Sequence, residues 1–523
     1  MGNSQEPQDF NISVMPSSLT PVHVAKAAEG LNLYDTASHQ VSHFVPLKPG
    51  EVGIYVCGAT VQSSPHIGHI RAAVAFDIVR RWFLKLGYKV TFVRNVTDID
   101  DKILVKAAAA GQRWWARAYY YEREFTEAYN TLGVLPPTVE PRATGHMSDM
   151  IDLIQRILDN GHGYVVTDAD GKPTGNVYFD VASWPHYGEL THQKQTSEVD
   201  EAAAVADRMG PSVDATGADK YNPVDPADAS PDKHDPRDFA LWKAPKDTDP
   251  EDARWSTPFG VGRPGWHIEC SAMSHRYLGD GFDIHGGGLD LRFPHHENEI
   301  AQSECANGCE FARYWMHNGF INVDNQKMSK SLHNFFTVRD VADIYGYEPI
   351  RYFMLTAGYR MPLNYTVDLI ESCKNSLERL YTCRENLDFA LTKNTFGTDE
   401  TLKEKAAEAR TKFCTAMDDD LNTPDALAAV FDLVKEINTL SAVSSKDALQ
   451  TAAAAFDEIT GVLGLLYNRK KDEVPAEVTE LVEKRAAAKK AKDWATADAI
   501  RAQLTELGWA VKDTAQGPQL SKL

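Results

Sequence analysis

The first part of the chain alternates between residue patterns typical of strands and of helices. Residues 51–59, EVGIYVCGA, form a short apolar run rich in Val and Ile, which predicts a buried strand. Pro65 suits the first turn of a helix, and residues 70–87 carry helical periodicity that ends at a Gly. A second strand is expected at residues 88–96, followed by the acidic helix start TDIDDKI. This order predicts a parallel, doubly wound α/β sheet.

The α/β pattern is interrupted once and then resumes. Helical patterns continue to about residue 160, and NVYFDV at 176–181 predicts a strand. Residues 192–236 lose periodicity and are dominated by Asp, Ala and Pro, which indicates a surface insertion that is partly disordered. A strand, a helix and a further strand are then expected at residues 282–288, 290–306 and 313–324. Residues 345–470 are almost entirely helical in pattern, and 478–509 form another helical segment.

Composition and charge narrow the class of protein. The 523 residues are 43% hydrophobic and 24% charged, as in ordinary globular proteins. The net charge of −20 does not suggest a wholesale nucleic-acid binder, although a local basic face can serve. Seven scattered Cys fit a reducing cytosol with metal-binding or catalytic thiols better than a disulfide scaffold. No secretory signal and no run of 18 apolar residues occur, so we expect a cytoplasmic protein. The final Ser-Lys-Leu matches a peroxisomal address, a match that three residues make easily by chance.

Two short motifs follow expected strands and suit phosphate binding. His66 and His69 lie in the first turn of a helix, where free backbone N–H groups and the helix dipole attract anions. Lys327 and Lys330 belong to KMSKS on a loop after a strand and can clamp a polyphosphate. Each motif alone has an ordinary alternative, a surface His pair or a solvated basic turn. Their occurrence together in two halves of one α/β domain favours the phosphate interpretation.

Competing nucleotide and nucleophile signals are weaker. GVGRPG at 260–265 satisfies G-x-G-x-x-G, but its Pro and the absence of a preceding strand make it a false match. DGKP lacks the Ser or Thr of a P-loop. HGGG at 285–288 is similar to a lipase oxyanion loop, yet no G-x-S-x-G nucleophile accompanies it.

Metal-ligating residue types occur in two candidate groups. Cys57, Cys270, His295 and Glu299 would supply two thiolates, an imidazole and a carboxylate, with the last two on one helical face. The alternative pair, Cys305 and Cys309, also has helical spacing but lacks a comparable His or Glu. A buried Cys is often simply part of the core.

The motifs HIGH at 66–69 and KMSKS at 327–331 resemble both signatures of the class I aminoacyl-tRNA synthetases. The resemblance implies a Rossmann-type catalytic domain that binds ATP, in which His66, His69 and Lys330 stabilise adenylate formation. Ligand binding at the carboxyl ends of the strands agrees with this fold.

Further segments resemble the cysteinyl-tRNA synthetase family: YVCGAT, PGWHIECSAM, DIHGGG and FPHHENE. The similarity extends from about residue 32 apart from the Asp/Pro insertion, with small departures at Ala59, 62–64 and Leu289. It implies one zinc ion held by Cys57, Cys270, His295 and Glu299. It also implies that Asp290 binds the ribose of ATP and that the cysteine site is formed by Gly58, Thr60, Thr97, Trp266 and His285.

This chemistry explains the residue types. Cysteine differs from serine by one atom, a change that a shape-selective pocket distinguishes by only ~1–3 kcal/mol. Zinc binds a thiolate well and an alcohol poorly at neutral pH. The expected reaction joins the cysteine carboxylate to the α-phosphorus of ATP, with Mg²⁺ assisting as pyrophosphate leaves. The cysteine then passes to the 3′ end of tRNA(Cys).

The C-terminal half is expected to bind tRNA. DDDLNTPDAL at 418–427 resembles the helical anticodon-side domain of this family. A local basic helix follows, with a solvated helical face as its alternative; its residues are Lys484, Arg485, Lys489, Lys490, Lys492 and Arg501. Trp494 and Trp509 are available to stack on anticodon bases, although either can be core.

The resemblance suggests a monomer with seven segments. These are a flexible leader (1–30), two catalytic halves (31–140 and 251–325), a connective insertion (141–250), a KMSKS and stem-contact region (326–385), a helical bundle (386–470) and an anticodon-binding region (471–523). One rival is a paralogous mycothiol-type cysteine ligase with an amino-sugar acceptor, which lacks the long region after KMSKS. Another is a non-catalytic, zinc-stabilised RNA-binding protein, which would have no use for His66, His69 and Lys330.

Overall fold

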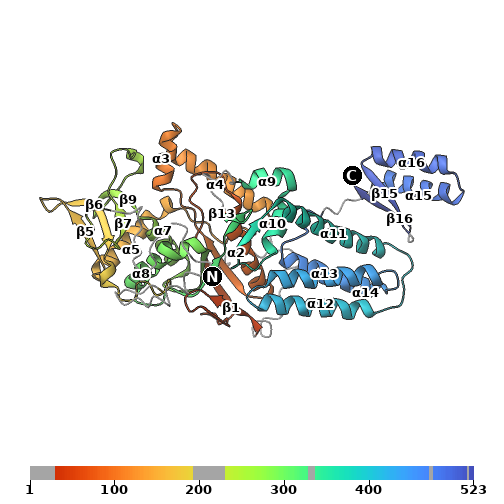
Figure 1. Cartoon of the computed structure of the whole chain (residues 1–523), viewed down its shortest axis with the longest axis horizontal. Helices are drawn as coiled ribbons and strands as arrows, with labels where there is room; N and C mark the ends of the chain where they lie inside the picture. The colour runs from red at the N-terminus through yellow and green to blue at the C-terminus, as the bar shows by residue number, and fades with distance from the viewer. Residues whose placement is uncertain (1–29, 193–229, 328–335, 470–474, 515–516, 523) are drawn as a thin grey trace, which may run out of the picture.

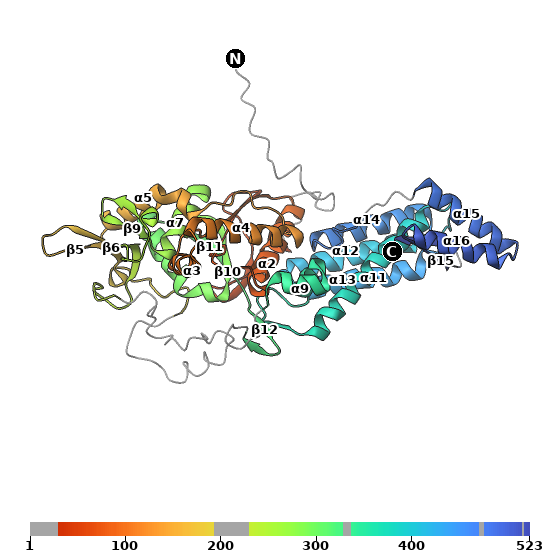
Figure 2. The ribbon, with the colours of Figure 1, turned by 90° about the horizontal axis from the view of Figure 1, so that it is seen from above.

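The computed structural model describes residues 30–192, 230–327, 336–469, 475–514 and 517–522 (Figures 1 and 2). The expected leader therefore lies outside the described residues except for Gly30, as does most of the Asp/Pro insertion and, within KMSKS, residues 328–331. In the part that is described, no helix is both long and apolar enough to cross a membrane.

A four-stranded parallel sheet forms the centre of the catalytic half, in the order β11-β10-β3-β4. Its strands are β3 (Glu51–Val56), β4 (Lys89–Arg94), β10 (Phe282–Gly288) and β11 (Ala312–Asn318). The predicted doubly wound α/β class is confirmed. The last predicted strand, 313–324, is two elements: β11 ends at Asn318, and β12 (Ile321–Val323) belongs to a separate small sheet with β13 (Gln326–Lys327) and β14 (Leu363–Tyr365).

Helix α2 (Ile67–Lys85) follows β3, as the periodicity predicted. His66 caps it: its Nδ1 accepts a hydrogen bond from the Gly68 amide at 3.1 Å, while its own amide donates to His69 Nδ1 at 3.3 Å. The capping fixes both imidazoles at the helix N-terminus. The other helices of the catalytic half are α3 (Asp101–Ala109), α4 (Trp114–Thr131), α5 (Met147–Asp159), α7 (Trp266–Leu278) and α8 (Glu297–Asn307).

The helix expected over 290–306 starts later than predicted. Helix α8 begins at Glu297 and is preceded by a short 3-10 turn and a kink at Phe293, whose backbone is extended (φ −137°, ψ 137°). Pro294 disfavours the helical conformation at the residue before it, which explains the interruption. His295 consequently lies before α8 rather than on its face.

An antiparallel sheet is inserted between the two halves of the parallel sheet, in the order β5-β6-β7-β9-β8. The sequence predicted only one of its strands, β6 (Pro173–Phe179); the others are β5 (Gly163–Thr167), β7 (Phe239–Lys243), β8 (Trp255–Thr257) and β9 (Gly260–Pro264). The GVGRPG segment is itself strand β9 with β8 before it, so the expected absence of a preceding strand is wrong. A Cβ on Gly262 would come within 2.3 Å of the Lys243 carbonyl oxygen, which explains that glycine by close packing.

The remaining chain is mainly helical, as predicted, and extends away from the parallel sheet (Figure 1). It contains α9 (Val338–Tyr345), α10 (Tyr347–Leu355), α11 (Val367–Leu391), α12 (Thr401–Asp418), α13 (Thr423–Leu440) and α14 (Lys446–Val462). A terminal module follows with its own small core: α15 (Ala476–Lys490), α16 (Trp494–Glu506), β15 (Trp509–Thr514) and β16 (Gly517–Lys522). The sequence predicted its helices and missed the antiparallel pairing of β15 with β16.

Candidate active site and metal centre

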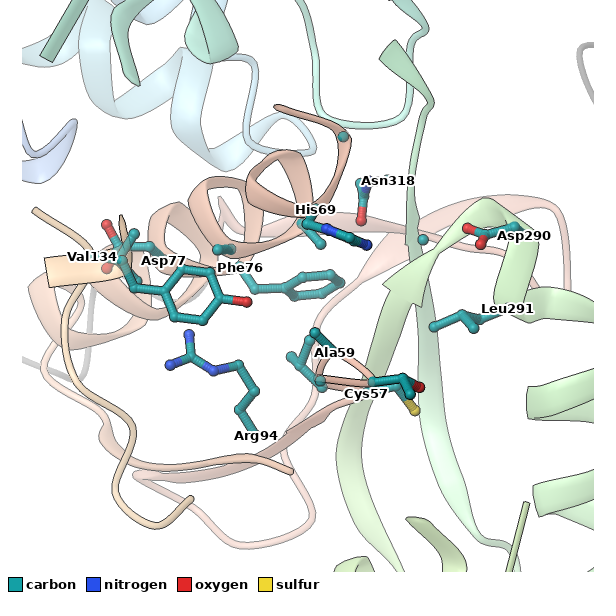
Figure 3. A pocket seen from close by; sticks show the side chains of 18 of the residues that line it. Cys57, Ala59, His69, Phe76, Asp77, Arg94, Val134, Asp290, Leu291 and Asn318 are labelled. Atoms are coloured by element: carbon teal, nitrogen blue, oxygen red, sulfur yellow. The ribbon is translucent and has the colours of Figure 1, made fainter. Parts of the chain in front are cut away.

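A cavity of about 410 Å³ lies at the carboxyl ends of the parallel strands and the N-terminus of α2. Figure 3 shows Cys57 and Ala59 along one side of it, and His69 on α2 together with Asp290 along the other. Eight predicted site residues from separate segments meet at the cavity. Seven of them line it: Cys57, Gly58, Thr60, His66, His69, Trp266 and Asp290. The eighth, His295, stacks behind Trp266 with ring centroids 4.3 Å apart.

The four predicted metal ligands converge beside this cavity. One ligand atom from each of Cys57, Cys270, His295 and Glu299 lies within 4.8 Å of every other, and all four residues are buried. The Cys57 and Cys270 sulfurs are 3.6 Å apart, and Glu299 Oε1 is 3.3 Å from the Cys57 sulfur. Adjacent ligands of a tetrahedral zinc site with Zn–S bonds of ~2.3 Å are separated by roughly 3.5–3.8 Å. The two thiols, the imidazole and the carboxylate therefore fit zinc in both type and spacing.

The electrostatics of this cluster favour the charged forms of Glu299 and Cys270 but the neutral thiol of Cys57. Burial raises the pKa of Glu299, but His285 and His295 outweigh it and hold that pKa at about 2. Burial also opposes ionisation of Cys270, yet hydrogen bonding by Cys57 and the charge of His295 lower its pKa to about 6. Burial and its acidic neighbours raise the pKa of the Cys57 thiol well above its usual value. A cation here would offset the repulsion among these buried anionic donors.

The alternative pair, Cys305 and Cys309, belongs to none of the metal-ligand clusters found among the described residues. Cys305 is buried within α8, whereas Cys309 lies beyond the helix end and is exposed. The helical spacing therefore does not place the two thiols together.

Histidines that the sequence analysis did not single out support the cluster. His267 Nδ1 lies 3.0 Å from His295 Nδ1, and His296 belongs to a second possible ligand set with Cys57, His285 and Glu299. His285 was expected to form a wall of the cysteine site. The structure instead places its Nε2 2.9 Å from Glu299 Oε2, outside the residues that line the cavity. This contact orients Glu299, one of the possible metal ligands, in the way that residues behind the ligands of a metal site do.

Three residues predicted to contact cysteine shape the end of β3 and β4. The Gly58 amide donates to Asn95 Oδ1 at 2.8 Å, and a Cβ on Gly58 would lie 1.7 Å from the Asn95 carbonyl oxygen. Thr60 lines the cavity and forms a backbone bridge with Thr97. Thr97 is buried and donates to Glu269 Oε2 at 2.8 Å, so its side chain supports the wall rather than lining the cavity.

The His pair lines the cavity at the N-terminus of α2. The rings of His66 and His69 stack with centroids 3.5 Å apart. Burial, and the neighbouring His66, lower the pKa of His69 well below its usual value, so this imidazole is neutral at pH 7. Lys102, which the sequence analysis did not single out, also lines the cavity, with its Nζ 6.0 Å from the Trp266 ring. Lys327 ends β13, and Lys330 lies outside the described residues.

The residues predicted to bind tRNA divide into two groups in the terminal module. Those that are exposed are Lys484, Lys490, Lys492, Trp494 and Arg501. Arg485 is buried and donates to both carboxylate oxygens of Asp513 at 2.8 Å, and Lys489 pairs with the same carboxylate at 2.8 Å. Trp509 is part of the module's core. Arg485 and Trp509 thus stabilise the module and differ from the exposed basic and aromatic face that the sequence predicted.

Family models assign the whole arrangement to a known class. Residues 43–375 match the class I (C) tRNA synthetase catalytic domain, residues 412–467 match the DALR domain, and residues 471–519 match the cysteinyl-tRNA ligase anticodon binding domain. Solved structures share the fold. A Mycobacterium tuberculosis methionyl-tRNA synthetase in complex with methionyl-adenylate is 17% identical with a TM-score of 0.54, covering 79% of this chain and 89% of its own. An Agrobacterium radiobacter LeuRS–tRNA–LeuAMS complex is 13% identical with a TM-score of 0.55, covering 80% and 85%. The fold and site define a class I aminoacyl-tRNA synthetase.

Curated relatives narrow this class. The chain is 68% identical to the cysteine–tRNA ligase of Bifidobacterium longum, over 99% of each chain. It is 46% identical to the cysteine–tRNA ligase of Cutibacterium acnes, over 94% of this chain and 96% of that one. The chain belongs to the cysteine–tRNA ligase family and is an aminoacyl-tRNA ligase. The resemblance noted from the HIGH and KMSKS motifs is confirmed.

Proposed function

We propose that the cavity activates L-cysteine with ATP, forming cysteinyl-adenylate and pyrophosphate, and then transfers cysteine to the 3′ end of tRNA(Cys). The observation that carries this proposal is the position of the buried donor set beside a cavity that also contains the α2 N-terminus. The donor set suits a thiol, and the N-terminus of α2 suits phosphates. A chain used only for zinc-stabilised RNA binding would not need both on one cavity.

One zinc ion per chain would be held by Cys57, Cys270, His295 and Glu299. When bound, the metal would accept the substrate thiolate and discriminate against an alcohol. The protein contributes the rest of the selectivity. Trp266 covers the ligand His295 from the cavity side, His285 orients Glu299, and burial keeps water from the donors.

The phosphate side is proposed to act through hydrogen bonding and charge. His69 stacks on His66 at the positive end of α2, where negative charge on the transferring phosphate builds up. Asp290, which lines the same cavity, is proposed to accept hydrogen bonds from the ribose hydroxyls of ATP. Lys327 and Lys330 are proposed to complete the polyphosphate site, and Mg²⁺ to accompany ATP.

Transfer to tRNA is proposed to involve the exposed basic residues of the terminal module, and the chain is proposed to act as a cytoplasmic monomer. A mycothiol-type ligase with an amino-sugar acceptor is not favoured, because residues 471–519 match an anticodon binding domain. Such an acceptor would leave this domain without a role.

The proposed reaction is tested by charging total tRNA with labelled cysteine in the presence of ATP and Mg²⁺. The expected result is label on the cysteine-accepting tRNA and none with labelled serine. Cysteine-dependent pyrophosphate exchange without any charging would instead support the amino-sugar ligase. Loss of both activities in folded, zinc-loaded protein would contradict catalysis by this cavity.

The zinc assignment has a separate test that does not depend on activity. Metal analysis of purified Cys270→Ser should show that most of the zinc is lost, because a thiolate ligand has been removed. Cys309→Ser is the matched control, since that thiol is exposed and outside the cluster, and it should keep one zinc per chain. Equal zinc content in the two variants would contradict the ligand set.

A further inference from the structure

Arg71 of α2 is a buried cation that the proposed catalytic roles do not use. It lies in the second turn of the helix, two residues after His69, which places the two side chains on opposite faces. Arg71 is only 2% exposed, and no carboxylate pairs with it among the residues that the structure describes. Burial lowers its pKa to about 10, so the guanidinium stays charged at pH 7. A buried charge without a counter-ion is costly, which indicates a role beyond packing.

The guanidinium holds the backbone of a loop that follows α10. Its Nη1 donates to the carbonyl of Met354, and its Nη2 donates to the carbonyl of Gly358 at 2.9 Å. Longer contacts from Nη2 reach the carbonyls of Tyr359 and Met361, at 3.4 and 3.5 Å. Arginine suits this arrangement because its planar group presents several N–H donors in fixed directions. The α10–β14 loop, residues 356–361, is thereby fixed to α2.

The α10–β14 loop supports one wall of the cavity. This wall consists of residues 319–321, which follow β11 and line the cavity. The Gly319 amide donates to the Tyr359 carbonyl at 2.9 Å. Just beyond the loop, the Leu363 amide donates to the Phe320 carbonyl at 2.9 Å. The position of the wall therefore depends on the position of the loop.

The α10–β14 loop also leads into the small sheet that precedes the rest of KMSKS. Strand β14 pairs with β12, and β12 pairs with β13, which ends at Lys327. Figure 3 shows Asn318, the residue before the wall, on the side of the cavity that holds His69. Helix α2 thus presents the His pair on one face, while Arg71 on the opposite face fixes the loop that supports the wall and the small sheet.

Other contacts hold the same region. The Asp420 carboxylate accepts hydrogen bonds from the Tyr359 hydroxyl at 2.9 Å and from Arg360 Nε at 2.6 Å, so it anchors the α10–β14 loop from the helical bundle. Backbone hydrogen bonds between residues 65–67 and 336–338 tie the start of α2 to the start of α9. Loss of the guanidinium should therefore loosen the attachment of the loop to α2 without detaching it.

We propose that Arg71 is a positioning residue for adenylate formation. It fixes the His pair relative to the small sheet that ends at Lys327, and so sets the width of the nucleotide side of the cavity. This inference rests on the proposed function, because it assumes that both elements act on ATP. Arg71 itself touches no substrate and acts only through the backbone that it holds.

The test measures cysteine-dependent pyrophosphate exchange in Arg71→Met, which keeps an unbranched apolar side chain and removes the donors. Misplacement of reacting groups by about 1 Å costs about 10²-fold, so kcat should fall by about that factor. The KM for cysteine should stay within about twofold of wild type, because Cys57 and Trp266 lie at the ends of β3 and α7 rather than on this wall. Arg71→Lys keeps the charge but not the planar fork, so its kcat should remain about tenfold below wild type.

Arg384→Met is the matched control. Arg384 is also buried, with 6% exposed, but it pairs with Asp457 of α14 at 2.7 Å, and its loss should leave the kcat of exchange unchanged. Amide hydrogen exchange at Gly319 and Leu363, the donors between the wall and the chain that supports it, needs no activity. Both amides should exchange faster in Arg71→Met, whereas those of α7 should not.

The outcomes separate this inference from the proposed function. A wild-type kcat in folded Arg71→Met, or full activity in Arg71→Lys, would overturn the positioning role. A fall that Arg384→Met shares, or one accompanied by loss of zinc and an equal rise in the KM for cysteine, would show general destabilisation and overturn it too. Absence of exchange in the wild type would instead overturn the proposed function, while faster amide exchange in Arg71→Met would still establish the attachment.

A second variant covers the case in which Arg71→Met does not fold. Asp420→Asn releases the α10–β14 loop from its other side without altering α2. It should give a smaller fall in kcat with the same unchanged KM for cysteine. A wild-type kcat in Asp420→Asn, together with faster amide exchange at Gly319, would overturn the link between the loop and catalysis.

Discussion

A buried carboxylate, Asp77, joins the helix that carries the His pair to the helical half of the protein. It accepts hydrogen bonds from Arg81 Nε at 2.7 Å, Arg351 Nη2 at 2.5 Å and the Leu135 amide at 2.8 Å. The two arginines continue to the end of α14: Arg81 donates to the Gly461 carbonyl and Arg351 to the Leu463 carbonyl. We predict that Asp77→Asn weakens this junction strongly although the side chain keeps its size.

The magnitude follows from burial. The Asp77 and Arg351 side chains are completely inaccessible to solvent, so Asp77→Asn leaves two buried guanidinium groups without their counter-ion. Breaking a buried ion pair in this way costs about 3–5 kcal/mol. Burial alone would raise the pKa of Asp77, but Arg81 and Arg351 lower it. The carboxylate therefore stabilises the fold at any pH above the ordinary Asp value of ~3.9, and this stabilisation is lost as the pH falls through the lower folded pKa.

The assay is amide hydrogen exchange at pH 7.5, because a multi-domain chain has no single free energy of unfolding. Protection of α2 and α10 amides should fall roughly 10²- to 10⁴-fold in Asp77→Asn, the equivalent of the energy above. Asp432→Asn is the control: Asp432 also pairs at 2.7 Å, with Lys412, but both side chains are more than half exposed. A fall of less than about fivefold in α2 and α10, no larger than the control's effect on its own helix, would refute the argument from burial.

Three further outcomes are expected. His69→Ala should slow cysteine-dependent pyrophosphate exchange about 10²-fold with zinc content unchanged, and wild-type exchange would contradict its phosphate role. Deleting residues 475–523, which have their own core, should reduce tRNA charging more than exchange; equal losses would make the module purely structural. Burial raises the pKa of Asp418 to about 6, so its charge destabilises the fold at pH 8. Asp418→Asn should raise Tm at pH 8, and should raise it by a smaller amount at pH 5, where the Asp418 carboxyl of the folded protein is mostly protonated. A change in Tm that does not depend on pH would contradict this.

The local elements were predictable wherever one physical signal dominated. The apolar strand around Ile54, the periodic helix after His66 and the helices from α10 to α14 follow from hydrophobic spacing, and the structure confirms them. Four of the five strands of the inserted sheet were missed because they are short and interrupted by residues such as Gly262. The start of α8 was missed because Pro294 acts on the residue before it.

The sequence by itself determined the chemistry of this protein: which residue types it offers, and that HIGH and KMSKS accompany a thiol, imidazole and carboxylate set. Only the tertiary structure decided which of them meet. Cys57 and Cys270 are 213 residues apart in the chain, yet their sulfurs lie 3.6 Å apart because β3 and α7 pack together. Packing likewise turned His285 towards Glu299 and buried Arg485 against Asp513. Local sequence does not encode such outcomes, since they depend on which side chains the whole core brings within contact distance.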